Sequence, residues 1–266
     1  MTDTISEGSM EQTKPTPLYE YGHRGVMGEA PQNTLASFEK VLQAGLPAIE
    51  LDVELSSDGR AVIFHDDTVD EITGQQAHGP INSFSFDELR RLNVSDGFDA
   101  GTSYQIPTLE EVLDLVDRYR HSRDTPALVN IELKGVNTAE PTAKIVKEYL
   151  ASGWLPENFI VSSFKHDELA KFKQLMPQLD IAILIDDKQW KALDKSNQKA
   201  VELADSMGAV GLNPGLEFVN SELVQMAHQA GLKVNVYTIK TAEEYAKMAQ
   251  MGVDGVFVNF LNLAQN

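Results

Sequence analysis

The chain has 266 residues, 42% of them hydrophobic, and its 40 acidic and 22 basic side chains leave a net charge of −18. This length is enough to bury a large core, and α/β barrels of this size commonly form one domain. The negative charge repels nucleic acids and anionic membranes, so we expect no nucleic-acid partner and no stable membrane association. The chain has no cysteine, which excludes disulfide bonds and thiolate metal sites.

The first eighteen residues are polar and rich in Pro, Ser and Thr, and they lack the basic and apolar regions of a secretory signal. This composition predicts a disordered tail over residues 1–18, followed by a single domain over residues 19–266. Because no signal and no apolar stretch of membrane-spanning length is present, we expect a cytoplasmic protein. Its oligomeric state stays open between monomer and homodimer.

Short apolar strands alternate with amphipathic helices along most of the chain, which is typical of a parallel sheet covered by helices. The predicted strands cover residues 19–23, 49–55, 60–65, 127–133, 159–162, 180–185, 209–212, 233–238 and 255–258. The predicted helices cover residues 34–44, 108–121, 139–151, 166–176, 188–207, 220–230 and 241–250. Asn33 is the expected N-cap of the first helix, and capping boxes begin at Ser85, Thr108 and Thr241.

The strand count and the alternation predict a closed TIM (β/α)8-type barrel, to which all these strands except the one at 60–65 belong. The strand at 60–65 follows a turn at Ser57-Asp58-Gly59 and is expected to pair with the strand before it. Residues 66 to about 106 interrupt the alternation and predict an inserted subdomain between the second and third barrel strands. In such barrels the catalytic groups lie at the carboxyl ends of the strands.

Carboxylates lie where the predicted strands end. Glu50 and Asp52 face the same side of an apolar strand, where they repel each other and lose hydration unless a cation neutralises them. Glu132 and Lys134 share one face of the third barrel strand with Asn130. Hard oxygen ligands of this kind suit Mg²⁺ or Ca²⁺, so Glu50, Asp52 and Glu132 are candidate ligands of one divalent cation. The alternative is a structural ion-pair network, in which Glu132 would pair with Lys134 or Arg24.

His23 and His65 also lie at the ends of predicted strands, beside this carboxylate cluster. Histidines exchange protons near neutral pH, so these two form a candidate acid–base pair, with structural histidines as the alternative. Arginine and lysine suit an anionic phosphate oxygen. Four further histidines are predicted at the surface, namely His78, His121, His166 and His228.

Six short motifs occur in the order seen in glycerophosphodiester phosphodiesterases, and the chain resembles that family from about Tyr21 to Phe260. The motifs are His23-Arg24-Gly25, Ala30-Pro31-Gln32-Asn33-Thr34, Glu50-Leu51-Asp52, His65-Asp66, Ile106-Pro107-Thr108-Leu109-Glu110-Glu111-Val112-Leu113 and Glu132-Leu133-Lys134. The resemblance implies metal-dependent hydrolysis of glycerophosphodiesters, such as glycerophosphocholine and glycerophosphoethanolamine, to sn-glycerol 3-phosphate and an alcohol.

The resemblance also implies roles for single residues. Arg24 and Lys134 would bind the phosphate. His23 would act as the base and His65 as the acid, although the reverse order stays open. The nucleophile is either a glycerol hydroxyl of the substrate or a water molecule. Side chains at other strand ends are further pocket candidates, namely Asn33, Phe164 and Tyr237.

Three positions depart from the family's usual pattern. Gln32 stands where a glutamate is usual, Glu71 where an arginine is usual, and Asn259 where an aspartate is usual. None of them is among the residues assigned to the chemistry, so we expect them to affect substrate preference. Two other functions stay open. A lipid-directed phosphodiesterase (a lysophospholipase D or a cyclising phospholipase) would require an apolar rim, and a non-catalytic barrel would only bind phosphate or metal.

Overall fold

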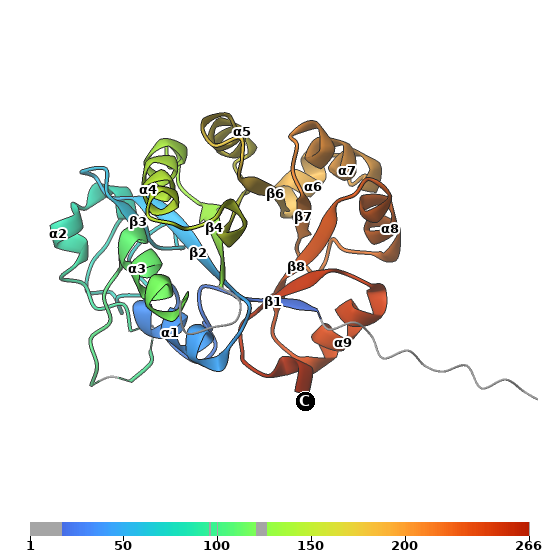
Figure 1. Cartoon of the computed structure of the whole chain (residues 1–266). Helices are drawn as coiled ribbons and strands as arrows, with labels where there is room; N and C mark the ends of the chain where they lie inside the picture. The colour runs from blue at the N-terminus through green and yellow to red at the C-terminus, as the bar shows by residue number, and fades with distance from the viewer. Residues whose placement is uncertain (1–17, 96, 100, 121–126, 266) are drawn as a thin grey trace, which may run out of the picture.

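The computed structural model describes residues 18–95, 97–99, 101–120 and 127–265, and parallel strands form a closed barrel at its centre (Figure 1). The barrel strands are β1 (Tyr19–Gly22), β2 (Ala48–Leu55), β4 (Leu128–Leu133), β5 (Phe159–Ser163), β6 (Asp180–Ile185), β7 (Gly211–Pro214), β8 (Lys233–Ile239) and β9 (Gly255–Val258). They pair in the order β1-β9-β8-β7-β6-β5-β4-β2, and the pairing of β1 with β2 closes the ring. The predicted eight-stranded barrel is therefore confirmed, and β3 (Ala61–Ile63) pairs antiparallel with β2 as an additional strand.

Helices surround the barrel (Figure 1). The α-helices are α1 (Leu35–Ala44), α2 (Phe86–Leu89), α3 (Leu109–Arg120), α4 (Ala139–Ala151), α5 (His166–Leu175), α6 (Asp187–Ala192), α7 (Asn197–Ser206), α8 (Ser221–Gln229) and α9 (Ala242–Met251). Three single turns of 3₁₀ helix complete the described elements, namely η1 (Ile81–Ser83), η2 (Pro156–Asn158) and η3 (Leu263–Gln265). Within the described residues, no helix has both the length and the apolar content needed to cross a membrane.

The predicted helix over residues 188–207 is wrong, because the chain forms two helices there. α6 and α7 are separated by a turn in which Asp194 and Lys195 adopt positive φ angles of 53° and 55°. Ser196 then caps α7 by accepting a hydrogen bond from the backbone N–H of Lys199. A polar side chain that bonds the backbone locally favours a helix start over helix continuation, which explains the break.

The predicted N-cap of α1 is also wrong by one residue. Thr34 is the cap, since its backbone is extended and its hydroxyl accepts a hydrogen bond from the backbone N–H of Ser37 at 3.3 Å. Asn33 has a positive φ of 56°, and its side chain turns instead toward Asp52 on β2. Asn33 is therefore available to the site at the end of the barrel.

The two faces of each barrel strand lie in different environments. On β2, Ile49, Leu51 and Val53 are fully buried in the main core with the helices, whereas Glu50 and Asp52 face the barrel interior. Leu18, which the sequence assigned to the tail, is buried in the same core, and residues 1–17 lie outside the described part of the chain. The polar side chains of β2 thus face the interior of the barrel.

The segment between β3 and α3 has an apolar core of its own. This cluster consists of Val62, Phe64, Val69, Ile72, Ile81, Leu89, Val94 and Ile106. Arg90 ties the segment to α3, since its guanidinium donates to both carboxylate oxygens of Glu111 at 2.7 and 2.8 Å. The cluster lies beside the β2–β3 hairpin and holds the loop that carries His65.

The close packing of Gly25 against Ser37 is expected to stabilise the loop between β1 and α1. The φ of Gly25 is +81°, and an ideal Cβ would lie 2.2 Å from Ser37 Oγ and 2.6 Å from the Ser37 carbonyl carbon. We expect Gly25→Ala to lower the free energy of unfolding by more than about 2 kcal/mol, measured by urea denaturation. Gly231→Ala is the matched control, because its φ is +76° and no heavy atom lies within 4 Å. Equal losses in the two variants would contradict the packing argument.

Candidate active site

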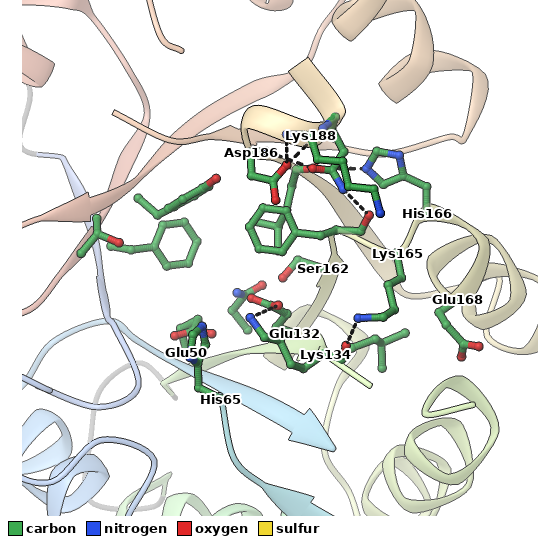
Figure 2. Close-up of a pocket in the computed structure, with 18 of the residues that line it drawn as sticks. Glu50, His65, Glu132, Lys134, Ser162, Lys165, His166, Glu168, Asp186 and Lys188 are labelled. Atoms are coloured by element: carbon green, nitrogen blue, oxygen red, sulfur yellow. Dashed lines mark hydrogen bonds and ion pairs between the residues drawn. The ribbon is translucent and has the colours of Figure 1, made fainter. Parts of the chain in front are cut away.

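Three buried carboxylates meet at the carboxyl end of the barrel. Glu50 and Asp52 come from β2 and Glu132 from β4, where Asp52 and Glu132 are paired in register. One oxygen of each lies within 4.8 Å of the others, and the three residues are only 3%, 1% and 7% exposed. Figure 2 shows Glu50 and Glu132 facing the same cavity. The structure thus brings together the three acidic residues that the sequence predicted as ligands.

Cationic and amide groups form hydrogen bonds and ion pairs with some of these carboxylate oxygens. Asp52 accepts a hydrogen bond from Asn33 Nδ2 at 2.8 Å and lies 3.5 Å from Arg24 Nε. The backbone N–H of Arg24 donates to Glu50 at 2.8 Å, and Lys134 Nζ lies 3.5 Å from Glu132. Two side-chain cations therefore face three carboxylates.

Two buried carboxylate oxygens of the cluster make no hydrogen bond. They are Asp52 Oδ1 and Glu132 Oε1, and Glu132 Oε1 faces Lys134 Nζ only as an ion pair at 3.5 Å. Burial, followed by the charges of Asp52 and Glu132, raises the pKa of Glu50 well above its usual range. Burial and Asp52 likewise raise the pKa of Glu132 to about 8. Unpartnered buried oxygens and a donor set made only of carboxylates fit a hard divalent cation.

The charges in the cluster are not equivalent. Burial disfavours the ionised form of Asp52, but His65, Arg24 and Lys134 outweigh this effect and hold the pKa of Asp52 below its usual range. The pKa of Lys134 is raised despite burial, because Glu132 and Asp52 stabilise its charge. The shifts in pKa therefore favour the charged forms of Asp52 and Lys134 and the protonated forms of Glu50 and Glu132.

The two candidate catalytic histidines lie in different environments. His23 is 8% exposed, and its Nδ1 lies 2.7 Å from Asn259 Oδ1, so Nδ1 donates the proton and Nε2 keeps its lone pair. Burial and the Arg24 charge lower the pKa of His23 to about 3. The His65 side chain is 27% exposed, and its Nδ1 lies 2.8 Å from the carboxylate of Asp66. His23 is therefore a neutral imidazole with a free acceptor, and His65 has an anionic partner.

A cavity of about 1160 Å³ joins these groups. The predicted site residues that line it are His23, Arg24, Glu50, His65, Glu132, Lys134, Phe164 and Tyr237. The rings of Phe164 and Tyr237 meet edge to face with centroids 5.7 Å apart, and Lys134 Nζ lies 5.7 Å from the centre of the Phe164 ring. Asn33 and Asp52 do not line the cavity. They are hydrogen-bonded to each other, and Asp52 contacts the lining residue Arg24.

Some cavity residues were missed by sequence reasoning. His166 was predicted at the surface, which is wrong: it is half-buried, lines the cavity and has Nε2 3.1 Å from the Leu184 carbonyl oxygen. Asn130 and Ser162 line the cavity from β4 and β5, and Asp186 and Glu217, which follow the carboxyl ends of β6 and β7, form its outer wall. Only Asn130 had a signal in the sequence, because it shares a strand face with Glu132.

Two of the departures from the family pattern contact the site. Arg24 Nη1 donates to Gln32 Oε1 at 2.6 Å, so a neutral amide positions the guanidinium without neutralising it. Asn259 likewise offers a neutral oxygen to His23. The third, Glu71, is exposed in the inserted segment.

Comparison with known proteins agrees with this arrangement. The sequence model of the glycerophosphoryl diester phosphodiesterase family matches residues 23–263. The chain is 32% identical over 244 residues to a glycerophosphodiester phosphodiesterase of Bacillus altitudinis, which covers 90% of this chain and 94% of that protein. An Oleispira antarctica phosphodiesterase in complex with the product sn-glycerol-3-phosphate superposes with a TM-score of 0.74 at 28% identity, over 91% of this chain and 93% of that one.

A glycerophosphodiester phosphodiesterase of Thermotoga maritima superposes with a TM-score of 0.72 at 27% identity, over 92% of this chain and 95% of that one. Its fold and those of the other relatives match nearly the whole described barrel. The family match covers well over half of the chain and includes every residue of the carboxylate cluster and both histidines. The chain belongs to the glycerophosphoryl diester phosphodiesterase family.

Proposed function

We propose that this protein hydrolyses glycerophosphodiesters to sn-glycerol 3-phosphate and an alcohol, with a divalent cation at Glu50, Asp52 and Glu132. The observation that carries the proposal is the meeting of three buried carboxylates with two histidines in opposite environments in one cavity. The product complex of the Oleispira antarctica relative supports a glycerol phosphate ligand. When bound, the cation supplies positive charge that stabilises the charge developing on phosphate oxygens, and the oxygen-only donor set accepts Mg²⁺ or Ca²⁺.

The side-chain cations bind the phosphate group. Arg24 and Lys134 both line the cavity and flank the carboxylate cluster from the segments that follow β1 and β4. Because Gln32 leaves the charge of Arg24 intact, the guanidinium keeps donors for an anionic oxygen. These two residues also offset the net negative charge of the protein where the phosphate binds.

The environments of the histidines divide the proton transfers between them. His23 bonds Asn259 through Nδ1, which leaves the Nε2 lone pair free, so we assign it as the base that accepts the proton of the nucleophile, a glycerol hydroxyl or a water. The carboxylate of Asp66, 2.8 Å from His65 Nδ1, orients the His65 ring, and we assign His65 as the acid that donates the proton to the leaving alcohol. The assignment follows from one histidine having an amide partner and the other a carboxylate partner.

The outer wall of the cavity favours a positively charged alcohol. Burial, followed by the charges of Asp186 and Glu217, raises the pKa of the Tyr237 hydroxyl, so both carboxylates act on this ring. Glu217 Oε2 and the Tyr237 hydroxyl both lie within 3.2 Å of the position that a Cβ on Gly215 would take. Carboxylates beside the rings of Tyr237 and Phe164 suit an ammonium group. Glycerophosphocholine and glycerophosphoethanolamine are the expected substrates.

A lipid-directed activity would require an apolar rim around the cavity. Among the described residues that line it, Val136 is the one large hydrophobic side chain that is exposed, at 59%. Half of the other lining residues are charged, including Asp167, Lys188 and Glu217. These observations favour a small polar substrate over a lipid.

The reaction is tested by measuring release of sn-glycerol 3-phosphate. We expect turnover of glycerophosphocholine and glycerophosphoethanolamine that EDTA abolishes and Mg²⁺ or Ca²⁺ restores, because three carboxylates await a cation. Glycerophosphoglycerol, whose alcohol is neutral, should have a higher KM. Neutralising the outer wall with the double substitution Asp186→Asn and Glu217→Gln should raise the KM for glycerophosphocholine about 10-fold and leave that for glycerophosphoglycerol unchanged. No turnover of any glycerophosphodiester by folded, metal-loaded protein would refute the proposed activity.

The cation site is tested by thermal unfolding. The pKa of Glu132 is about 8 in the folded protein and about 4.5 when unfolded, so the metal-free protein loses stability as pH rises through this range. A divalent cation should therefore raise Tm more at pH 8 than at pH 5. In EDTA at pH 8, Glu132→Gln should raise Tm by several degrees and abolish the cation-dependent shift. Glu157→Gln, at an exposed position, is the control; a normal cation shift in Glu132→Gln would exclude Glu132 as a ligand.

The histidine roles are separated by the choice of leaving group. Replacing either His23 or His65 by Ala should lower kcat for glycerophosphocholine roughly 10²–10⁴-fold. With a p-nitrophenyl ester of glycerol phosphate, whose leaving group needs no protonation, His65→Ala should recover most of its activity and His23→Ala should not. The control is His78→Ala, in which the removed side chain is 66% exposed in the inserted segment. Recovery in His23→Ala instead would exchange the two roles.

A further inference from the structure

The loop between β4 and α4, residues 134–138, carries Lys134 beside the carboxylate cluster. Next to this loop lies the segment of residues 163–168, which leads from the end of β5 into α5. Figure 2 shows Lys165 of this segment bonded through its ammonium group to the backbone of the loop. The loop that carries a candidate phosphate ligand is therefore in direct contact with the following βα connection.

Side chains of the segment bond the carbonyl groups at the start of the loop. The Lys165 ammonium donates to the Lys134 carbonyl oxygen. The Ser163 hydroxyl donates to the Leu133 carbonyl oxygen at 2.7 Å and accepts from the backbone N–H of Lys165 at 2.8 Å. The centre of the Phe164 ring lies 5.7 Å from Lys134 Nζ. The segment therefore contacts both the backbone and the side chain of Lys134.

Glu168 bonds the other end of the loop. Its two carboxylate oxygens accept from the backbone N–H groups of Asn137 at 2.9 Å and of Ala139 at 3.1 Å. Glu168 is the third residue of α5, where a glutamate commonly bonds back to the cap of its own helix. Within the described residues, Thr138, the N-cap residue of α4, makes no side-chain cap of its own. The start of α4 is therefore capped by the neighbouring helix, and its position depends on α5.

We propose that Lys165 and Glu168 are positioning residues that fix the β4–α4 loop and thereby hold the Lys134 ammonium where the phosphate binds. The inference rests on the proposed function, in which Lys134 binds the phosphate. A lysine side chain has a flexible four-carbon stem, so the place of its ammonium depends on how firmly its backbone is held. The two positioning residues have opposite charges. Their direct effects on an anion would therefore be opposite, whereas their effects through the loop are the same.

The inference is tested with full-length, metal-loaded protein by measuring kcat/KM for glycerophosphocholine and Kd for sn-glycerol 3-phosphate. Lys165→Met and Glu168→Met remove the bonds to the loop and keep side chains that favour helices. We expect each to lower kcat/KM and to raise Kd about 10-fold, because a displaced ammonium stabilises the phosphate less well. A purely electrostatic effect would instead make Glu168→Met bind the anion more tightly than wild type, and this result would overturn the inference.

Lys188→Met is the matched control, because Lys188 is an exposed lysine that also lines the cavity, but from α6. It should change Kd less than about 2-fold, since an exposed charge is screened by solvent and salt. A loss as large as that in Lys165→Met would show that any cavity lysine has this effect, and it would contradict a role through the loop.

A second comparison separates the loop from direct contact with the substrate. In a Lys134→Met background, Lys165→Met and Glu168→Met should raise Kd for sn-glycerol 3-phosphate less than about 2-fold further, because the ammonium that they hold is already absent. Losses as large as in the wild-type background would mean that both residues act by another route, and they would overturn the inference. The measurement of Kd needs no residual activity in Lys134→Met.

Hydrogen exchange of the loop provides a readout that does not depend on activity. The backbone amides of Asn137 and Ala139 should exchange faster in Glu168→Met than in wild type and at the wild-type rate in Lys188→Met. Unchanged exchange in Glu168→Met would refute the hold on the loop. If exchange rises as expected but folded, metal-loaded wild-type protein hydrolyses no glycerophosphodiester, the proposed function fails while the hold on the loop stands.

Discussion

The burial of three carboxylates within 4.8 Å of one another is the constraint on which the site depends. Charges removed from water repel one another strongly, and such a cluster persists only with compensation. The protein supplies part of it through Arg24, Lys134 and Asn33, all of which reach the cluster from neighbouring segments. The remaining deficit appears as the raised pKa of Glu132 and Glu50. The divalent cation proposed above would supply the missing positive charge, and relief of the repulsion among the three carboxylates would contribute to its affinity.

Two neutral amides adjust the groups around this cluster. Gln32 and Asn259 stand where the family usually has carboxylates, and each contacts a group that the mechanism uses, Arg24 and His23. A carboxylate at either position would add negative charge beside a site that already has an excess of it. With an amide, the charge of Arg24 is not offset by a neighbouring anion, and burial beside the neutral Asn259 favours the uncharged form of His23, which suits the roles proposed for both residues. The departures therefore act on the electrostatics of the site rather than on its geometry.

Much of this arrangement could be predicted from the sequence, because the signals are local. Alternation on single strands identified Glu50, Asp52 and Glu132, and strand count with helix capping gave the barrel. Contacts that depend on the closed barrel could not be predicted. Asn259 reaches His23 across 236 positions, and Ser162 faces the cavity only because β5 lies beside β4. The break between α6 and α7 was missed because positive φ angles leave no pattern in hydropathy.

Charged side chains are distributed unevenly around the cavity. Arg24 and Lys134 lie beside the carboxylate cluster, whereas Asp186 and Glu217 follow β6 and β7 at the mouth of the barrel. In the function proposed above, the phosphate of a zwitterionic glycerophosphodiester would bind near Arg24 and Lys134, and its cationic alcohol would point toward the mouth. The reverse orientation would place the ammonium beside Arg24 and Lys134 and the phosphate beside two carboxylates, which is unfavourable at both ends.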